Sequence, residues 1–461
     1  MLISFARKRI LAAALVASAA LFIASTIAST AKAQEVDFAA QGLTPLGSEQ
    51  KGNADGSIPP WKGGITRPPA GWSVGEDHVD PYADDKPLFT ITPANYQQYR
   101  KFLTPGQQDM FRRFASYKMP IYPSHRSCAL PQSVYRATAQ NAARARLAED
   151  GNGLEGALMG VPFPLPKSGL EAVRNHHFHY HGTSLTAKVS GANVYPNGRV
   201  TRIVRDDKRY HYYADPATAS PQALNNAQYI WMGVWSAPSR AAGRGFSMTN
   251  TINQVRQPRP GFFYRPDVRK TVRATASSTE YDAPVTSAAG LRVSDNIFIY
   301  TGSPDRYQWQ LKGKREMYIP YNAYRASQRS VAFKDMLTPN HLNPEFLRYE
   351  KHRVWVVEGT LKPSFGHVYH KRVFYLDEDS WIIVLADLYD SRGNLMRMQE
   401  GFVKNYYEIP ACVAEFDVIY DLPTGRYNTD NMKNEFGPAN LDAKLSPRDF
   451  GATALRRAVS R

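Results

Sequence analysis

The chain has 461 residues, of which 43% are hydrophobic and 12% aromatic, with 27 tyrosines among them. This composition is typical of one large globular domain or two ordinary ones, and the aromatic residues favour β-sheet over a helix bundle. The formal net charge of +16 comes from scattered Lys and Arg residues, which argues against a continuous polybasic anchor.

The N-terminus has the three parts of a secretory signal peptide. Arg7, Lys8 and Arg9 give a positive start, residues 10–24 are apolar, and residues 31–33 read Ala-Lys-Ala, a small-x-small cleavage pattern. The apolar run is shorter than the ~20 residues that a membrane-spanning helix needs. We therefore expect cleavage after residue 33 and a periplasmic protein, associated with the outer membrane or free of it, and no nucleic-acid partner.

Residues 34–120 are rich in Pro, Gly and Asp, and predict an extended, turn-rich arm that carries the first helices. Thr104 followed by Pro105 is typical of a helix start. Met110 and Phe111 then fall on one side of that helix.

Two more helices are predicted before the strands begin. Residues 131–149 have an amphipathic pattern, which Asp-Gly-Asn-Gly ends at residues 150–153. Farther on, Ser168 with Glu171 three residues later is the pattern of a capping box, which starts a short helix.

Residues 176–181 read HHFHYH, which we interpret as a strand. His177, His179 and His181 would then share one face, and three imidazoles with a further ligand can bind zinc or copper. Metal sites usually gather ligands from several elements, so a polar strand face is the favoured interpretation. A metal site is the alternative, and no other cofactor is expected.

Residues 352–420 predict an antiparallel meander with short turns at 377–380 and 391–393. Asp377, Glu378 and Asp379 lie in the first turn. Paired carboxylates can serve as catalytic acids and bases, but we expect a solvated turn here.

The strands of this meander have apolar residues in continuous runs, whereas a sheet with one wet face alternates. Both faces are therefore predicted to be covered. The helices of residues 92–149 can cover one face. A second sheet, the arm or an apolar ligand can cover the other face. A plain β-sandwich core stays the simpler alternative, and the opposite choice of face is nearly as good. The predicted ligand-cavity residues are Trp355, Val357, Phe374, Leu376, Ile383 and Leu385.

The chain has two cysteines, Cys128 and Cys412. In an oxidising compartment two thiols suggest one disulfide, although the sequence leaves open whether they meet. Neither lies in a C-x-x-C motif, so thiol catalysis is not indicated.

Several long stretches resemble a known family. They include LTPLGSEQKGNADGSIPPWKGG from Leu43, GVPFPLPKSGLEAVRNH from Gly160, DNIFIYTGSPDRYQWQLKGKREMYIPYNAYR from Asp295 and KRVFYLDEDSWIIVLADLYDSRGNL from Lys371. From about residue 40 to the end, the chain resembles domain of unknown function family 1329, which is similar to LolA/LolB-type outer-membrane lipoprotein-sorting proteins.

This resemblance implies a mainly β fold, an incomplete antiparallel β-barrel wrapped over a few helices, with a hydrophobic cavity for acyl chains. It also implies transport across the envelope, with an inner-membrane exporter and an outer-membrane protein as partners. It supplies no catalytic residues. The histidines after His176 and both cysteines depart from the family pattern, which supports pairing of the cysteines.

The domain organisation predicted in this way has four parts. They are a signal peptide (1–33), the arm with the first helices (34–120), an antiparallel sheet domain (121–425) and a polar tail with a short helix (426–461).

The sequence shows no H-E-x-x-H, G-x-S-x-G or dinucleotide-binding motif in a suitable context. We therefore expect no enzyme. The resemblance, together with a sheet that is apolar on both faces, implies a carrier of a lipid or other hydrophobic molecule. An outer-membrane structural or adaptor protein, and an envelope hydrolase acting on lipid or polyester, are the alternatives.

Overall fold

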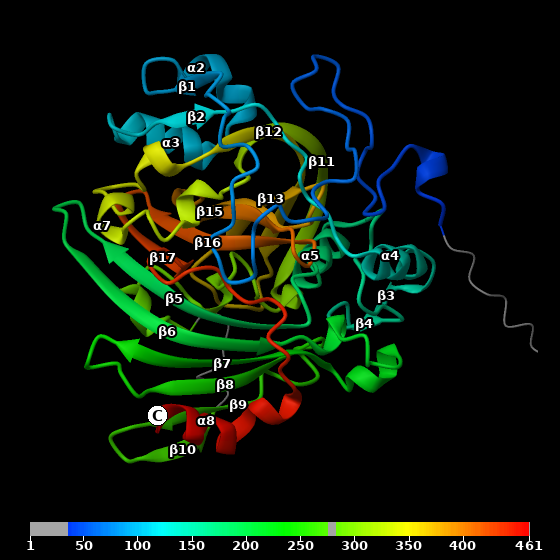
Figure 1. The fold of residues 1–461 in the computed structure, drawn as a ribbon, viewed down its shortest axis with the longest axis vertical. Coiled ribbons are helices and arrows are strands. Elements are labelled where there is room, and N and C mark those ends of the chain that lie inside the picture. Colours follow the sequence, from blue (N-terminus) through cyan, green and yellow to red (C-terminus); the bar gives the residue numbers. More distant parts are fainter. Residues whose placement is uncertain (1–35, 275–282, 461) are drawn as a thin grey trace, which may run out of the picture. The chain divides into compact units, whose positions relative to one another are not determined.

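An open, mostly antiparallel sheet dominates the computed structural model, which describes residues 36–274 and 283–460 (Figure 1). The strands follow the order β1-β2-β12-β13-β14-β15-β16-β17-β5-β6-β7-β8-β9-β10, and β11 also pairs with β12. The two end strands, β1 and β10, do not pair with each other, so the sheet does not close. The predicted mainly β fold with an incomplete antiparallel sheet is confirmed. The predicted signal peptide lies outside the described residues.

The strands of this sheet are β1 (Phe89–Ile91), β2 (Met119–Ile121), β5 (Ser184–Val194), β6 (Val200–Tyr210), β7 (Ala227–Ala237), β8 (Gly245–Thr251), β9 (Gly261–Arg265), β10 (Lys270–Arg273), β11 (Tyr307–Pro320), β12 (Tyr349–Leu361), β13 (Lys371–Asp377), β14 (Ile383–Tyr389), β15 (Leu395–Tyr406), β16 (Ala411–Asp421) and β17 (Arg426–Met432). Strands β3 (Arg146–Leu147) and β4 (Leu154–Glu155) form a separate pair. The α-helices are α2 (Tyr96–Tyr99), α3 (Pro105–Arg113), α4 (Gln132–Arg144), α5 (Gly169–His177), α7 (Phe333–Met336) and α8 (Gly451–Val459).

The meander predicted for residues 352–420 is present as β12 to β16, each strand antiparallel to the next. Helix α3 starts where expected, because the Thr104 side chain accepts a hydrogen bond from the Gln107 N–H and the Gln107 side chain accepts one from the Thr104 N–H. Helix α5 starts at Ser168, whose hydroxyl accepts from the Glu171 N–H.

The predicted strand over residues 176–181 is wrong. Helix α5 continues through His177, and residues 178–183 then form an irregular segment. Ala172, Val173 and His176 form the buried side of α5. The Ser168 cap starts a helix that runs through His177, and this outweighs the short alternation of histidines and aromatics.

The polar stretch at residues 426–432 is strand β17, between β16 and β5 in the sheet, rather than part of a polar tail. Polar side chains of this strand are buried with hydrogen-bond partners, as Asn428 shows. Asn428 donates to the Ala192 carbonyl and accepts from Arg292, so it lies buried at 4% exposure. Hydrogen bonding thus places a polar sequence inside the sheet.

Both faces of the meander are covered by the protein itself. On one side Met398, Phe402 and Phe416 pack with α3 through Met110 and Phe111. On the other side the strands pack with α4, α5 and the arm, in a cluster that includes Leu46, Val134, Val173, Val357, Phe374 and Leu376. The arm therefore seals the sheet rather than extending away from it.

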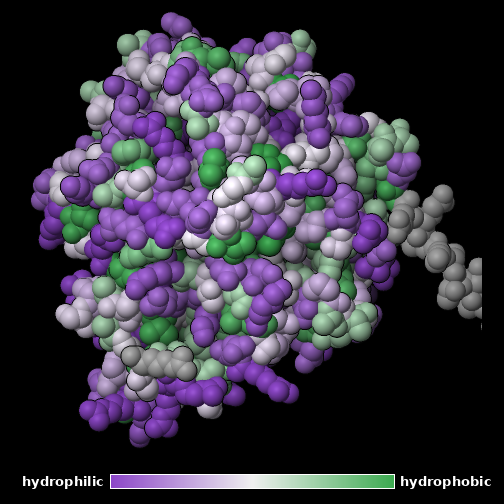
Figure 2. All heavy atoms as spheres, in the orientation of Figure 1, coloured by the Kyte–Doolittle hydropathy of each residue, from purple (hydrophilic) through white to green (hydrophobic). Residues whose placement is uncertain are grey.

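The surface in Figure 2 is mainly hydrophilic, and its hydrophobic residues lie in small separate groups. Among the described residues, no helix has the length and apolar character needed to cross a bilayer.

Candidate functional site

The six residues predicted to line a cavity lie in the packed core. Val357, Phe374, Leu376, Ile383 and Leu385 are fully buried, and Trp355 is half-buried beside Trp381. None of the six lines the cavity described below. The residues of the opposite face, including Val354 and Tyr375, are also buried core.

A cavity opens instead between β5, β6, β7, β16 and the irregular segment after α5. It holds about 930 Å³ of space free of atoms, including its opening to solvent. Figure 1 shows β5, β6 and β7 side by side in the sheet, and β17 links β5 to β16.

The apolar wall of the cavity comes mainly from alternate positions of one strand. Leu185, Ala187 and Val189 line it from the same face of β5, because side chains two apart on a strand share a face. Val413 and Ala414 of β16 add to this wall. Ile382, Phe298, Ala439 and Leu441 also line the cavity.

Five histidines gather where β5 begins and β6 ends, a region called the polar end of the cavity here. His176 and His177 come from the end of α5, His179 and His181 from the segment after it, and His211 from the residue after β6. The His179 and His181 rings lie 4.8 Å apart between centroids, and His181 Nε2 lies 3.1 Å from His211 Nδ1.

His176 has a structural role within this group. Its Nδ1 accepts from the Ile383 N–H at 3.1 Å, and its Nε2 contacts the Phe298 carbonyl at 3.2 Å. These two partners fix a neutral imidazole with the hydrogen on Nε2. Burial is the main cause that lowers the pKa of His176 to about 3, so it stays neutral.

The other four histidines, named the cavity histidines here, are His177, His179, His181 and His211. Burial lowers the pKa of each one, to about 4 for His179 and well below the usual range for the others. Nearby cations, Arg174 for His177 and Arg209 for the rest, add to this lowering. All four are therefore neutral near pH 7.

Three ring nitrogens of the cavity histidines are buried and have no hydrogen-bond partner among the described residues. They are His177 Nε2, His181 Nδ1 and His211 Nε2. An unsatisfied buried polar atom costs about 1–3 kcal/mol. Several of them together at one end of a cavity indicate a binding site.

The loop that carries Phe298 has a strained backbone. Phe298 and Ile299 are both in the left-handed region, with φ of 51° and 67°. Such a conformation is an outlier for a β-branched residue and costs on the order of 1–3 kcal/mol. The His176 contact to the Phe298 carbonyl helps to hold this loop against the cavity.

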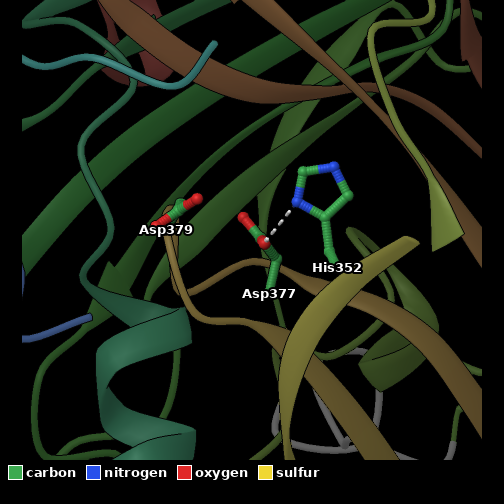
Figure 3. Close-up of side chains that lie close together, drawn as sticks. All are labelled: His352, Asp377 and Asp379. Atoms are coloured by element: carbon green, nitrogen blue, oxygen red, sulfur yellow. Dashed lines mark ion pairs between the residues drawn. The ribbon is translucent and has the colours of Figure 1, made fainter. Parts of the chain in front are cut away.

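Among the described residues, His177, His179 and His181 do not form a group of ligand atoms close enough to hold one metal ion. Within the described ranges, the group of ligand atoms close enough to hold one ion, all within 4.8 Å of one another, is His352, Asp377 and Asp379. Figure 3 shows these three side chains converging, with His352 Nδ1 3.9 Å from Asp377 Oδ1.

This second cluster belongs to a network of ion pairs, the hairpin network, formed by Arg126, Lys314, Arg353, Glu378 and Asp379. Arg126 donates two hydrogen bonds to Asp379, at 2.6 and 2.7 Å. Glu378 pairs with Arg353 at 2.6 Å and with Lys314 at 2.9 Å. Of the two carboxylates that would bind an ion, Asp379 is thus already engaged by the Arg126 cation.

Burial and the nearby Asp379 raise the pKa of Asp377 to about 7. Burial also acts on Asp379, but the hydrogen bonds and charge of Arg126 hold its pKa below the usual range. The Ser380 hydroxyl donates to Asp377 at 2.6 Å rather than to His352. The cluster therefore lacks the serine–histidine contact of a hydrolase relay.

The expectation of a solvated turn at Asp377, Glu378 and Asp379 is wrong, since all three are buried, at 4% exposure or less. The arm covers the turn. The Ser48 hydroxyl donates to the Glu378 carbonyl, and the Trp381 indole donates to the Leu46 carbonyl. Chain more than 300 residues away in sequence supplies this cover, which no local pattern in the turn reveals.

Cys128 and Cys412 form a disulfide in the structure, with their Cα atoms 5.7 Å apart. Cys128 lies two residues after Arg126 of the hairpin network, and Cys412 directly precedes Val413 of the cavity wall. The bond therefore links the two regions covalently.

Sequence reasoning missed two of the central polar residues, Arg209 and His211. Both lie in or beside β6, about 30 residues after the histidine segment. The spacing of Asp207, Arg209 and His211 at every second position was the available signal, because it places three polar groups on one strand face.

The comparisons with known proteins agree with the resemblance seen in the sequence. The family model described as protein of unknown function (DUF1329) matches residues 90–456, and the chain belongs to this family. A Pseudomonas aeruginosa protein described as uncharacterized protein PA3922 is 40% identical over 437 residues, which cover 94% of this chain and 95% of that protein.

Solved structures give weaker similarities. A DUF1329 family protein from Desulfovibrio piger has 13% identity and a TM-score of 0.40, covering 59% of this chain and 92% of that one. The LolA superfamily protein NE2245 from Nitrosomonas europaea has 12% identity and a TM-score of 0.36, covering 62% and 98%. At these scores the similarity carries no argument about ligand or mechanism.

Proposed function

We propose that the protein is a periplasmic carrier that binds a lipid or another hydrophobic molecule in the cavity beside β5. The observation that carries this proposal is a largely apolar wall, formed by Leu185, Ala187, Val189 and Val413, that lies beside the polar side chains Asp207 and Arg209 of β6 and the histidines of the same cavity. A ligand with a hydrocarbon part and a polar head matches this division.

Burial of hydrocarbon supplies the affinity in this proposal. Each buried methylene contributes ~0.8 kcal/mol, so six methylenes against the wall would contribute about 5 kcal/mol. An inner-membrane exporter and an outer-membrane protein are the partners that we propose for loading and release.

The test is the content of the protein as purified from its own periplasm. We expect organic-solvent extraction followed by mass spectrometry to yield an amphiphilic molecule that co-purifies with the protein. Ala187→Phe, which places a ring in the cavity, should lose this molecule. Ser236→Phe adds the same ring at an exposed position of β7 and should retain it.

An extract without any amphiphile, together with no uptake of a fluorescent fatty acid by the purified protein, would contradict the proposal. Equal loading of both phenylalanine variants would show that the ligand binds elsewhere.

A further inference from the structure

Arg209 is a cation at the polar end of the cavity that forms no ion pair among the described residues. Its guanidinium makes contacts with the faces of Trp231 and Phe298, at 5.2 and 4.0 Å from the ring centroids. No hydrogen bond or ion pair joins it to another side chain of the described residues, and its Nε is buried and unsatisfied. Burial lowers the pKa of Arg209, which reflects the cost of holding this charge in protein surroundings.

The acidic groups around Arg209 are engaged by other cations. Asp207 forms two hydrogen bonds with Arg205, at 2.6 and 3.0 Å. Asp430 also lies 3.6 Å from Arg205. Both carboxylates thus bind Arg205, and they act on Arg209 only through their charge, without a hydrogen bond or ion pair.

At the next acidic group along the sheet, cations outnumber carboxylates. Glu415 is shared by two lysines, Lys404 at 3.2 Å and Lys433 at 3.4 Å. Lys433 itself lines the cavity. Taken together, the four cations Arg205, Arg209, Lys404 and Lys433 face the three carboxylates Asp207, Asp430 and Glu415, so positive charge is in excess in this group.

The cavity histidines add hydrogen-bond donors. Arg174 donates to His177 Nδ1 at 3.3 Å, which places the hydrogen of His177 on the unpartnered Nε2. In the His181–His211 contact one ring donates to the other, so either tautomer leaves one N–H and one lone pair unused.

We propose that the ligand carries an anionic head group, a carboxylate or a phosphate, which binds to Arg209 and the His181–His211 pair. This inference rests on the proposed function and adds the chemical class of the ligand. Arginine binds both head groups through charge-assisted, paired hydrogen bonds. A divalent cation would be repelled by the same Arg209 charge.

Three probes with the same tail test this assignment on the delipidated wild-type protein by calorimetry at pH 7.5. They are decanoate, decyl phosphate and 1-decanol, of which only 1-decanol is uncharged. We expect at least one anion to bind about tenfold or more tighter than 1-decanol, as a charge-assisted hydrogen bond gives. The tighter of the two anions identifies the head group.

Arg209→Met should abolish this preference while the affinity for 1-decanol stays the same. Arg209→Lys, which keeps the charge, should retain part of it. Lys208→Met is the matched control, since it removes a positive charge from the opposite face of β6 and should leave the preference intact.

Equal binding of all three probes to the wild-type protein would overturn the anionic head group, and so would an unchanged preference in a folded Arg209→Met protein. In both cases the hydrophobic carrier function would survive. Failure of all three probes to bind would contradict the carrier function itself. The wild-type comparison decides the question even where Arg209→Met does not fold.

Discussion

The hairpin network and the polar end of the cavity are two buried polar clusters in one sheet protein, and they differ in how their charges are paired. In the hairpin network Arg126 meets Asp379, and Arg353 and Lys314 meet Glu378. At the cavity, Arg209 has no acidic partner among the described residues, and three histidine nitrogens are unsatisfied. Compensated charge of the first kind fixes architecture, whereas uncompensated charge of the second kind indicates a place for a ligand.

The largest expected effect comes from breaking the paired cluster. Arg126→Met leaves Asp379 buried without its bidentate partner, and loss of one partner of a buried ion pair costs about 3–5 kcal/mol. We expect a drop of this size in the free energy of unfolding, measured by urea denaturation.

A matched control is Arg112→Met, whose ion pair with Asp109 involves an arginine that is 61% exposed. Exposed pairs contribute only about 0–1 kcal/mol. Equal losses for Arg112→Met and Arg126→Met would show that the hairpin network does not stabilise the fold as described.

The disulfide between the two regions should have the next largest effect. The bond joins residues 284 positions apart, and removal of a native disulfide typically costs about 2–5 kcal/mol. We expect the double variant Cys128→Ala/Cys412→Ala to unfold at lower urea than the wild type, and wild-type protein treated with a reductant to behave like it. Unchanged unfolding of the double variant would mean that packing alone holds the two regions together.

A pH-dependent effect should follow from Asp377. Because its folded pKa is raised to about 7, the folded state holds a proton that the unfolded chain lacks from about pH 4 upward. Wild-type stability therefore falls as the pH rises through this window. Asp377→Asn has no carboxyl group to ionise at this position, so it does not lose this stability. Its free energy of unfolding relative to wild type should therefore increase by on the order of 1–3 kcal/mol between pH 5 and pH 8.

The measurement is the difference in melting temperature between Asp377→Asn and wild type at several pH values. A difference that is constant from pH 5 to pH 8 would show that Asp377 is ionised in the folded state throughout.

The smallest effect is expected at the unpaired cluster. Arg209→Met removes a buried charge that forms no ion pair with a carboxylate, so it should leave stability unchanged or raise it by up to about 1 kcal/mol. Urea denaturation of the ligand-free protein measures this. A loss as large as that of Arg126→Met would contradict the difference between the two clusters.

Local sequence patterns predicted the elements whose signals lie within a few residues. The Thr104 cap, the Ser168 cap and the meander of residues 352–420 are present because capping and short turns act locally. The resemblance to the family was found in the same way, from long contiguous stretches.

Features that depend on distant chain were missed. Burial of Asp377 needs the arm around Leu46. The polar end of the cavity needs His211, which follows β6 and is affected by the Arg209 charge, next to His181 from the segment after α5. The apolar runs at Val357 and Phe374 correctly indicated that both faces of the meander are buried. The face with Val357 and Phe374 packs against helices and the arm rather than against a ligand. Hydrophobicity alone does not distinguish a core from a cavity wall.

The most direct test of the central claim, that the cavity beside β5 is the binding site, is a crystal structure of the wild-type protein with bound decanoate. The claim predicts the carboxylate against Arg209 and the tail along Leu185, Ala187 and Val189. Decanoate bound at another place, with the cavity filled only by water, would contradict it.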